Sequence, residues 1–224
     1  MWVSLNEVEQ TSMMAARGAG YAFSLAGEAG SAARWLAMRG LPFLEPLCTG
    51  VLSQMHRLES FTSARQVGSS YGPTDVSRRF GPISVLTALL DGALGLPTGT
   101  EELSIRSLAA PALVLPVLAR LSKSYDRPLL VRWPGVAVEC RAGFVLVDDA
   151  RSAALGATHC DWLVVSRMAL PFAKAEEANC LRHHGANVDE THWRELRHLA
   201  NRTYTPESET VRRRGAGAGF IDNE

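Results

Sequence analysis

Glycine and alanine dominate residues 18–40, and this segment (GAGYAFSLAGEAGSAARWLAMRG) constrains the fold more than any other part of the chain. From residue 22 onward its small and apolar residues recur at the spacing of one helical face, and Gly40 is a natural C-terminal stop. We therefore expect a helix over residues 22–39 that packs tightly against a neighbour, because small side chains allow two backbones to approach closely. Glu28 lies at the border of this face, where a carboxylate requires a polar partner.

The residues before this segment predict the neighbouring helix. Ser4 and Glu7 form a capping box, and apolar and small residues follow at helical spacing as far as residue 16. The glycines in Gly18-Ala19-Gly20 then break the pattern and leave a short link. A link of this length predicts an antiparallel helical hairpin.

The rest of the chain changes from helical to strand-like patterns. Helical spacing predicts helices over residues 44–59 and 82–94, separated by a loop over residues 60–80. A strand is expected at residues 103–107, and a helix over residues 111–124 with a disturbance at Pro116. Short β-branched runs at residues 129–133, 136–140 and 144–148, separated by turn residues, are typical of an antiparallel meander. A further strand at residues 161–168 precedes an amphipathic helix that begins near residue 189.

These elements predict an α+β fold. The N-terminal helical hairpin and further helices pack on a mainly antiparallel sheet of about residues 103–168, and a C-terminal helix follows. We expect one domain over residues 1–224. Its helical part covers about residues 1–95, its sheet-containing part about residues 100–205, and an Arg/Gly tail residues 206–224.

Charge and composition exclude some classes of partner. The formal net charge is zero, which argues against a dedicated nucleic-acid binder. The longest apolar run, residues 109–119, contains two prolines and is too short to span a bilayer. No secretory signal is visible, and the four cysteines are scattered without C-x2-C spacing. We expect a soluble cytoplasmic protein with free thiols and no nucleic-acid or membrane partner.

Candidate site residues occur near both ends of the chain. At the front, Glu28 is the candidate catalytic acid–base group, and Arg17 with the turn glycines Gly18 and Gly20 is a candidate anion contact. At the back, successive N–H groups of a glycine-rich tail can hold an anion beside an arginine. The candidate ligand-binding residues are Glu7, Arg17, Gly18, Gly20, Arg34, Arg214, Gly215, Gly217 and Gly219.

Each candidate also has a purely structural explanation. The capping box accounts for Glu7, the helix dipole for Arg17, and a solvated surface for Arg34. The histidines and the cysteine near residues 180–198 lack the convergent spacing of a metal site. We therefore predict no metal and no cofactor.

Five motifs together resemble one uncharacterised family of bacterial, mainly proteobacterial, proteins that is catalogued only as a domain of unknown function. They are LNEVE, AARGAG, GEAGSAARWLAMRG, RTYTPESE and RRRGAGAGFIDNE. The resemblance implies a bacterial, single-domain protein of about 220 residues, and it implies no activity. Where the family pattern has a serine-arginine before the terminal glycines, this chain has three arginines at residues 212–214.

Two functions remain open from the sequence. The first is binding of a small anionic metabolite, as a binding protein or an enzyme, between the N-terminal hairpin and the Arg/Gly tail. The second is a non-catalytic role as a homodimer or as the accessory subunit of an enzyme, with the small-residue face as the interface. The first requires the two ends of the chain to meet in space.

Overall fold

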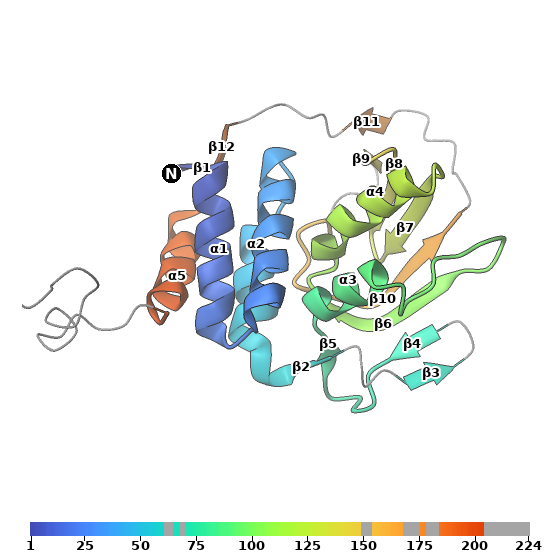
Figure 1. Cartoon of the computed structure of the whole chain (residues 1–224), viewed down its shortest axis with the longest axis horizontal. Coiled ribbons are helices and arrows are strands. Elements are labelled where there is room, and N and C mark those ends of the chain that lie inside the picture. Colours follow the sequence, from blue (N-terminus) through green and yellow to red (C-terminus); the bar gives the residue numbers. More distant parts are fainter. Residues whose placement is uncertain (61–64, 68–69, 149–153, 168–174, 178–183, 204–224) are drawn as a thin grey trace, which may run out of the picture.

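Helices and sheet lie side by side in the computed structural model, which describes residues 1–60, 65–67, 70–148, 154–167, 175–177 and 184–203. Figure 1 shows three helices next to one another, with α1 (Leu5–Ala19) between α2 (Phe23–Met38) and α5 (Glu190–Asn201). The sheet, with two shorter helices against it, lies beyond α2. The predicted α+β class is confirmed.

The N-terminal helical pair forms as its sequence predicts, with one correction at the link. Ser4 Oγ accepts a hydrogen bond from the backbone N–H of Glu7 at 3.1 Å, which caps α1. Gly20, with φ of +110°, ends α1 in the left-handed conformation that favours glycine. Gly18 was expected in the link, but it lies inside α1 because the helix continues to Ala19.

The small-residue face of α2 packs against α1 of the same chain. Ala26, Ala29, Gly30 and Ala33 are all buried. A Cβ atom on Gly30 would lie 2.7 Å from the carbonyl oxygen of Glu9, so only glycine allows this approach. α1 thus covers the small-residue face that the homodimer or accessory-subunit hypothesis assigns to an interface with a second chain.

The prediction of one regular helix over residues 44–59 is wrong. A π-helical turn, η1 (Pro46–Val51), is followed by a 3₁₀ helix, η2 (Leu52–Arg57), and by strand β2 (Leu58–Glu59). Gly50 in η1 lies against the backbone of Thr158, where a Cβ atom would be 2.6 Å from the carbonyl oxygen. The tertiary contact thus overrides the local helical pattern.

The sheet is larger than the sequence predicts, and it remains mainly antiparallel. The predicted meander is confirmed as β7 (Leu129–Trp133), β8 (Val136–Arg141) and β9 (Phe144–Asp148), and β10 (His159–Ser166) pairs with both β7 and β6 (Leu103–Ala109). β11 (Ala175–Glu177) extends the β9 edge. The region predicted as a loop supplies β3 (Arg65–Val67), β4 (Ser70–Gly72) and β5 (Arg79–Phe80), of which β4 and β5 run parallel to β6.

Two helices connect the helical layer to the sheet. α3 (Pro82–Leu90) contacts α2, and α4 (Leu115–Ser124) packs on β7, β8 and β9 while also contacting α2. A short 3₁₀ helix, η4 (Pro111–Val114), leads into α4. The disturbance expected at Pro116 is this junction, because Pro116 lies in the first turn of α4, where its missing N–H costs no hydrogen bond.

The first residues of the chain pack against its last described elements, which end before the predicted Arg/Gly tail. β1 (Trp2–Ser4) pairs antiparallel with β12 (Gly185–Asn187), and α5 packs along α1. Gly18 lies so close to α5 that a Cβ atom would be 1.9 Å from the carbonyl oxygen of Leu199. In the part of the chain that the structure describes, no helix combines the length and apolarity needed to cross a membrane.

Candidate functional site

The strongest candidate site is a cavity of about 480 Å³ where α2, α3 and α4 meet the turn between β8 and β9. We call it the basic cavity. It is lined by Glu28, Ser31, Ala32, Trp35, Arg39, Leu86, Leu90, Pro116, Val117, Arg120, Lys123, Ala142, Gly143 and Phe144. Its volume is in the range of small-molecule sites, and its walls are largely apolar with a few polar groups, as such sites usually are.

Trp35 and Arg39 form one polar corner of the basic cavity. The guanidinium carbon of Arg39 lies 3.7 Å from the centre of the Trp35 ring, a cation–π contact. Arg39 Nη1 also donates a hydrogen bond to the carbonyl oxygen of Trp35 at 3.3 Å. The guanidinium group is therefore held in place at the end of α2 before any ligand arrives.

Arg120 and Lys123 supply the charge from the α4 side. Both side chains are exposed, and among the described residues neither forms an ion pair with a carboxylate. Gly143 lies beside the stem of Lys123, and a Cβ atom on it would be 3.5 Å from Lys123 Cδ. Ala142 and Gly143 both have positive φ, at 51° and 87°, as a two-residue β-hairpin turn requires.

The basic cavity is lined by more positive than negative side chains. Three side chains, Arg39, Arg120 and Lys123, carry positive charge, and Glu28 is the one carboxylate in the described lining. Leu86, Leu90 and Val117 give apolar surface between them, and the Phe144 ring, which is 44% exposed, lies at the rim. Such a lining can hold an anionic group at one end and cover an apolar body at the other.

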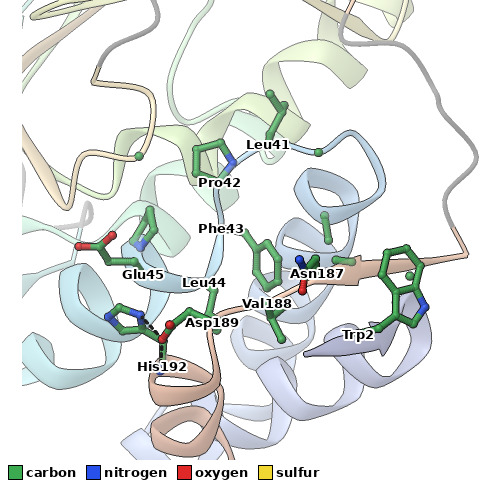
Figure 2. Close-up of a pocket in the computed structure, with 16 residues that line it drawn as sticks. Trp2, Leu41, Pro42, Phe43, Leu44, Glu45, Asn187, Val188, Asp189 and His192 are labelled. Atoms are coloured by element: carbon green, nitrogen blue, oxygen red, sulfur yellow. Dashed lines mark hydrogen bonds and ion pairs between the residues drawn. The ribbon is translucent and has the colours of Figure 1, made fainter.

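A second hollow, which we call the acidic groove, lies on the other side of the C-terminal end of α2. It measures about 760 Å³ and is lined by Trp2, Ala37, Gly40, Leu41, Pro42, Phe43, Leu44, Glu45, Pro46, Gly156, Gly185, Ala186, Asn187, Val188, Asp189 and His192. Figure 2 shows Trp2 at one end and the Asp189–His192 pair at the other, with Phe43 and Asn187 between them. Glu45 and Asp189 are its acidic residues.

The Asp189–His192 pair is held by the first turn of α5. Asp189 Oδ1 accepts hydrogen bonds from the backbone N–H groups of Thr191 and His192, at 3.0 and 2.9 Å, and lies 3.1 Å from His192 Nδ1. The hydrogen bond from the His192 backbone is the largest cause that lowers the pKa of Asp189 below its ordinary value. Asp189 is therefore a helix cap that keeps its negative charge.

The residues predicted for one site lie in several places. Of the candidates that the structure describes, only Glu28 lines the basic cavity. Arg34 pairs with Glu9 of α1 at 2.9 Å, and the Arg17 guanidinium carbon lies 5.6 Å from the centre of the Phe23 ring. Glu7 lies in a shallow hollow between α1 and α5 with Arg197.

The glycine candidates have structural roles where they are described. Gly18 is a close-packing position against α5, and Gly20 ends α1. The tail candidates Arg214, Gly215, Gly217 and Gly219 lie outside the described residues. The site built from both chain ends, as drawn from the sequence, therefore stays a prediction.

Metal and thiol chemistry find no support in the described part of the chain. No group of three or more His, Cys, Asp or Glu side chains there converges on a metal position. Cys48, Cys140 and Cys160 are free and buried, and burial raises the pKa of Cys48 and of Cys160 to about 12. Such thiols stay protonated near neutral pH, so they are not nucleophiles.

Sequence reasoning named Glu28, which lines this cavity, and did not name the basic residues on α4. The helical spacing of residues 28, 35 and 39 places Glu28, Trp35 and Arg39 on one flank of α2. Arg120 and Lys123 are far away in the sequence, and only the packing of α4 against α2 brings them to the same cavity. The acidic groove was also missed, because it joins residues from both ends of the chain.

Comparison with known proteins finds a family match in the N-terminal segment. Residues 3–61 match the family model described as "Protein of unknown function (DUF3726)", which confirms the resemblance to a domain of unknown function over this segment. The matched segment contains α1, α2 and Glu28. No curated protein and no solved structure matches the chain.

Proposed function

We propose that this protein binds a small organic anion with an apolar body in the basic cavity. The observation that carries the proposal is the set of three cationic side chains, Arg39, Arg120 and Lys123, around one largely apolar cavity. Guanidinium and ammonium groups at such a site pair with carboxylate or phosphate oxygens through charge-assisted hydrogen bonds. The apolar walls then favour a ligand with a hydrocarbon or aromatic body over a bare inorganic ion.

Glu28 offers the ligand a second kind of polar contact. A half-buried carboxylate in a cavity with three cations can accept a hydrogen bond from an ammonium or hydroxyl group of the ligand. If the protein is an enzyme, Glu28 is the acid–base group that this cavity offers. The ligand class that fits all four groups is an anion that also carries a hydrogen-bond donor.

The buried free thiols also support the predicted location. Three described cysteines are buried and form no disulfide, which suits the reducing cytoplasm. The alternative role, in a homodimer or as an accessory subunit, loses its proposed interface because α1 covers the small-residue face of α2. We therefore place ligand binding first.

A thermal-unfolding panel tests the proposal. The probes are 3-phenylpropanoate, phenylalanine, hexanoate, phenyl phosphate and inorganic phosphate. A ligand at a concentration of about a hundred times its dissociation constant stabilises by about 2.7 kcal/mol, which raises the midpoint by roughly 5 °C or more. We expect organic anions to raise the midpoint more than inorganic phosphate does.

Matched variants assign the effect to the cavity. Arg120→Gln and Lys123→Gln should each weaken the binding of the best probe about tenfold, because each removes a charged partner. Arg127→Gln removes the same charge from an exposed position outside the cavity lining and should leave binding unchanged. The proposal fails if no probe stabilises the protein, or if the cavity variants bind as the wild type does.

A second comparison tests the role of Glu28. Phenylalanine differs from 3-phenylpropanoate by an ammonium group, so the ratio of their affinities measures what Glu28 contributes. We expect Glu28→Gln to lower the affinity for phenylalanine relative to 3-phenylpropanoate. An unchanged ratio would remove Glu28 from the binding site and leave the basic residues in place.

A further inference from the structure

The acidic groove has apolar walls with polar groups at its two ends. Leu41 and Phe43 are buried side chains on one wall, and Val188 continues the apolar surface on the other. Trp2 is 63% exposed and lies at one end of the groove (Figure 2). A Cβ atom on Gly185 would be 2.7 Å from ring atoms of Trp2, so the glycine allows the indole to approach the strand closely.

One edge of β12 remains unpaired in the described chain. Val188 donates to the carbonyl oxygen of Met1 at 2.8 Å, and His184 accepts from the N–H of Leu5 at 3.1 Å. Because backbone groups alternate sides along an antiparallel strand, the N–H and C=O groups of Gly185 and Asn187 point away from β1. Within the described residues no backbone group pairs with them, and both residues line the groove.

The charge of the groove complements a cation. Glu45 and Asp189 are exposed carboxylates, and His192 is the one described lining residue that can carry positive charge. Asp189 holds its charge through two backbone N–H groups, so its carboxylate is fixed at the end of the groove. The exposed Trp2 ring at the opposite end offers a face to an apolar or cationic side chain.

We propose that the acidic groove binds an extended peptide segment of a partner protein that carries a lysine or arginine, with the peptide added as a strand to the free edge of β12. The strand edge provides main-chain hydrogen bonds, Leu41 and Phe43 receive an apolar side chain, and Glu45 and Asp189 pair with the basic residue. The unpaired strand edge favours a peptide over a small amine, because a small amine uses the carboxylates and leaves the edge without a partner.

Two pools of capped pentapeptides test the proposal, one with lysine fixed at the central position and one with glutamate. Affinity selection on the immobilised full chain should retain the lysine pool several-fold more than the glutamate pool. Asp189→Asn and Glu45→Gln should each reduce that ratio, whereas Asp161→Asn, an exposed carboxylate outside the groove, should not. Equal retention of the two pools by the wild type would overturn the proposal.

Two further arms separate a peptide site from a site for a small cation. N-methylation at successive positions of a selected peptide should weaken binding at alternate positions, because only alternate N–H groups of an added strand face β12. N-acetyl-lysine methylamide should bind much more weakly than the selected peptide. If it binds equally well, or if N-methylation has no alternating effect, strand addition is excluded.

Discussion

The basic cavity and the acidic groove lie on opposite sides of the same helical end and differ in charge and in origin. Arg39 faces the basic cavity, and the next residue, Gly40, lines the acidic groove. The basic cavity has three cations and one carboxylate, and the acidic groove has two carboxylates and a histidine. The end of α2 therefore separates two surfaces that attract opposite charges.

The two surfaces also depend on different packing contacts. The basic cavity is held by α2, α3, α4 and one β-turn, which all belong to the middle of the chain apart from α2. The acidic groove depends on the pairing of β1 with β12 and on the packing of α5 against α1. A change that loosens the chain ends should thus damage the groove and spare the cavity.

The largest expected effect on stability comes from Gly18→Ala, which disrupts the contact between α1 and α5. The new Cβ atom would lie 1.9 Å from the Leu199 carbonyl oxygen, so one of the two helices must shift. We expect the free energy of unfolding to fall by about 2–3 kcal/mol, as measured by urea denaturation. Anion binding in the basic cavity should persist in the folded fraction, and peptide binding in the groove should weaken.

Gly27→Ala is the matched control for that substitution. Gly27 also lies in a helix, and apart from its neighbours and the backbone of its own helix no described atom lies within 4 Å of the position of its Cβ. Alanine there should raise the free energy of unfolding by about 0.5–1 kcal/mol through helix propensity. A Gly18→Ala protein that was as stable as Gly27→Ala would contradict close packing of Gly18 against Leu199.

Charge substitutions in the two surfaces should act independently. Arg120→Gln should weaken anion binding about tenfold and leave the retention of lysine peptides unchanged. Asp189→Asn should weaken the retention of lysine peptides and leave anion binding unchanged. In the double variant, anion affinity should match that of Arg120→Gln and peptide retention should match that of Asp189→Asn. Coupling between the two sites, seen as a departure from additivity, would show that α2 transmits a change from one to the other.

The parts of this molecule that sequence predicted are those specified by local patterns. The cap at Ser4, the small-residue face of α2 and the meander of β7, β8 and β9 each depend on neighbouring residues, so periodicity and turn chemistry were sufficient. The region of η1 and η2 has helical spacing, but Gly50 in η1 packs against the backbone of Thr158. This contact is distant in the sequence, so no local pattern contains it.

The same distinction applies to the candidate site. Glu28, Trp35 and Arg39 could be grouped from helical spacing alone, because all three lie on α2. Arg120 reaches the cavity only through the packing of α4 on the sheet, and the unpaired edge of β12 depends on a strand pairing between the two chain ends. Long-range pairings of this kind leave almost no signal in a single sequence.

The smallest expected effect is the pH dependence of Asp189, which sharpens the assignment of fixed negative charge to the groove. Hydrogen bonds from the backbone N–H groups of His192 and Thr191 hold the pKa of Asp189 below its ordinary value of 3.8. A carboxyl group whose pKa is lowered by folding stabilises the protein above its unfolded pKa, and this contribution is lost as the pH falls through the folded pKa.

Asparagine caps a helix about as well as aspartate and does not titrate. The wild type should therefore be slightly more stable than Asp189→Asn near about pH 7, and the difference should shrink below about pH 4. Denaturant unfolding of both proteins across this range measures it, and a difference that stays constant with pH would mean that the cap acts through geometry alone.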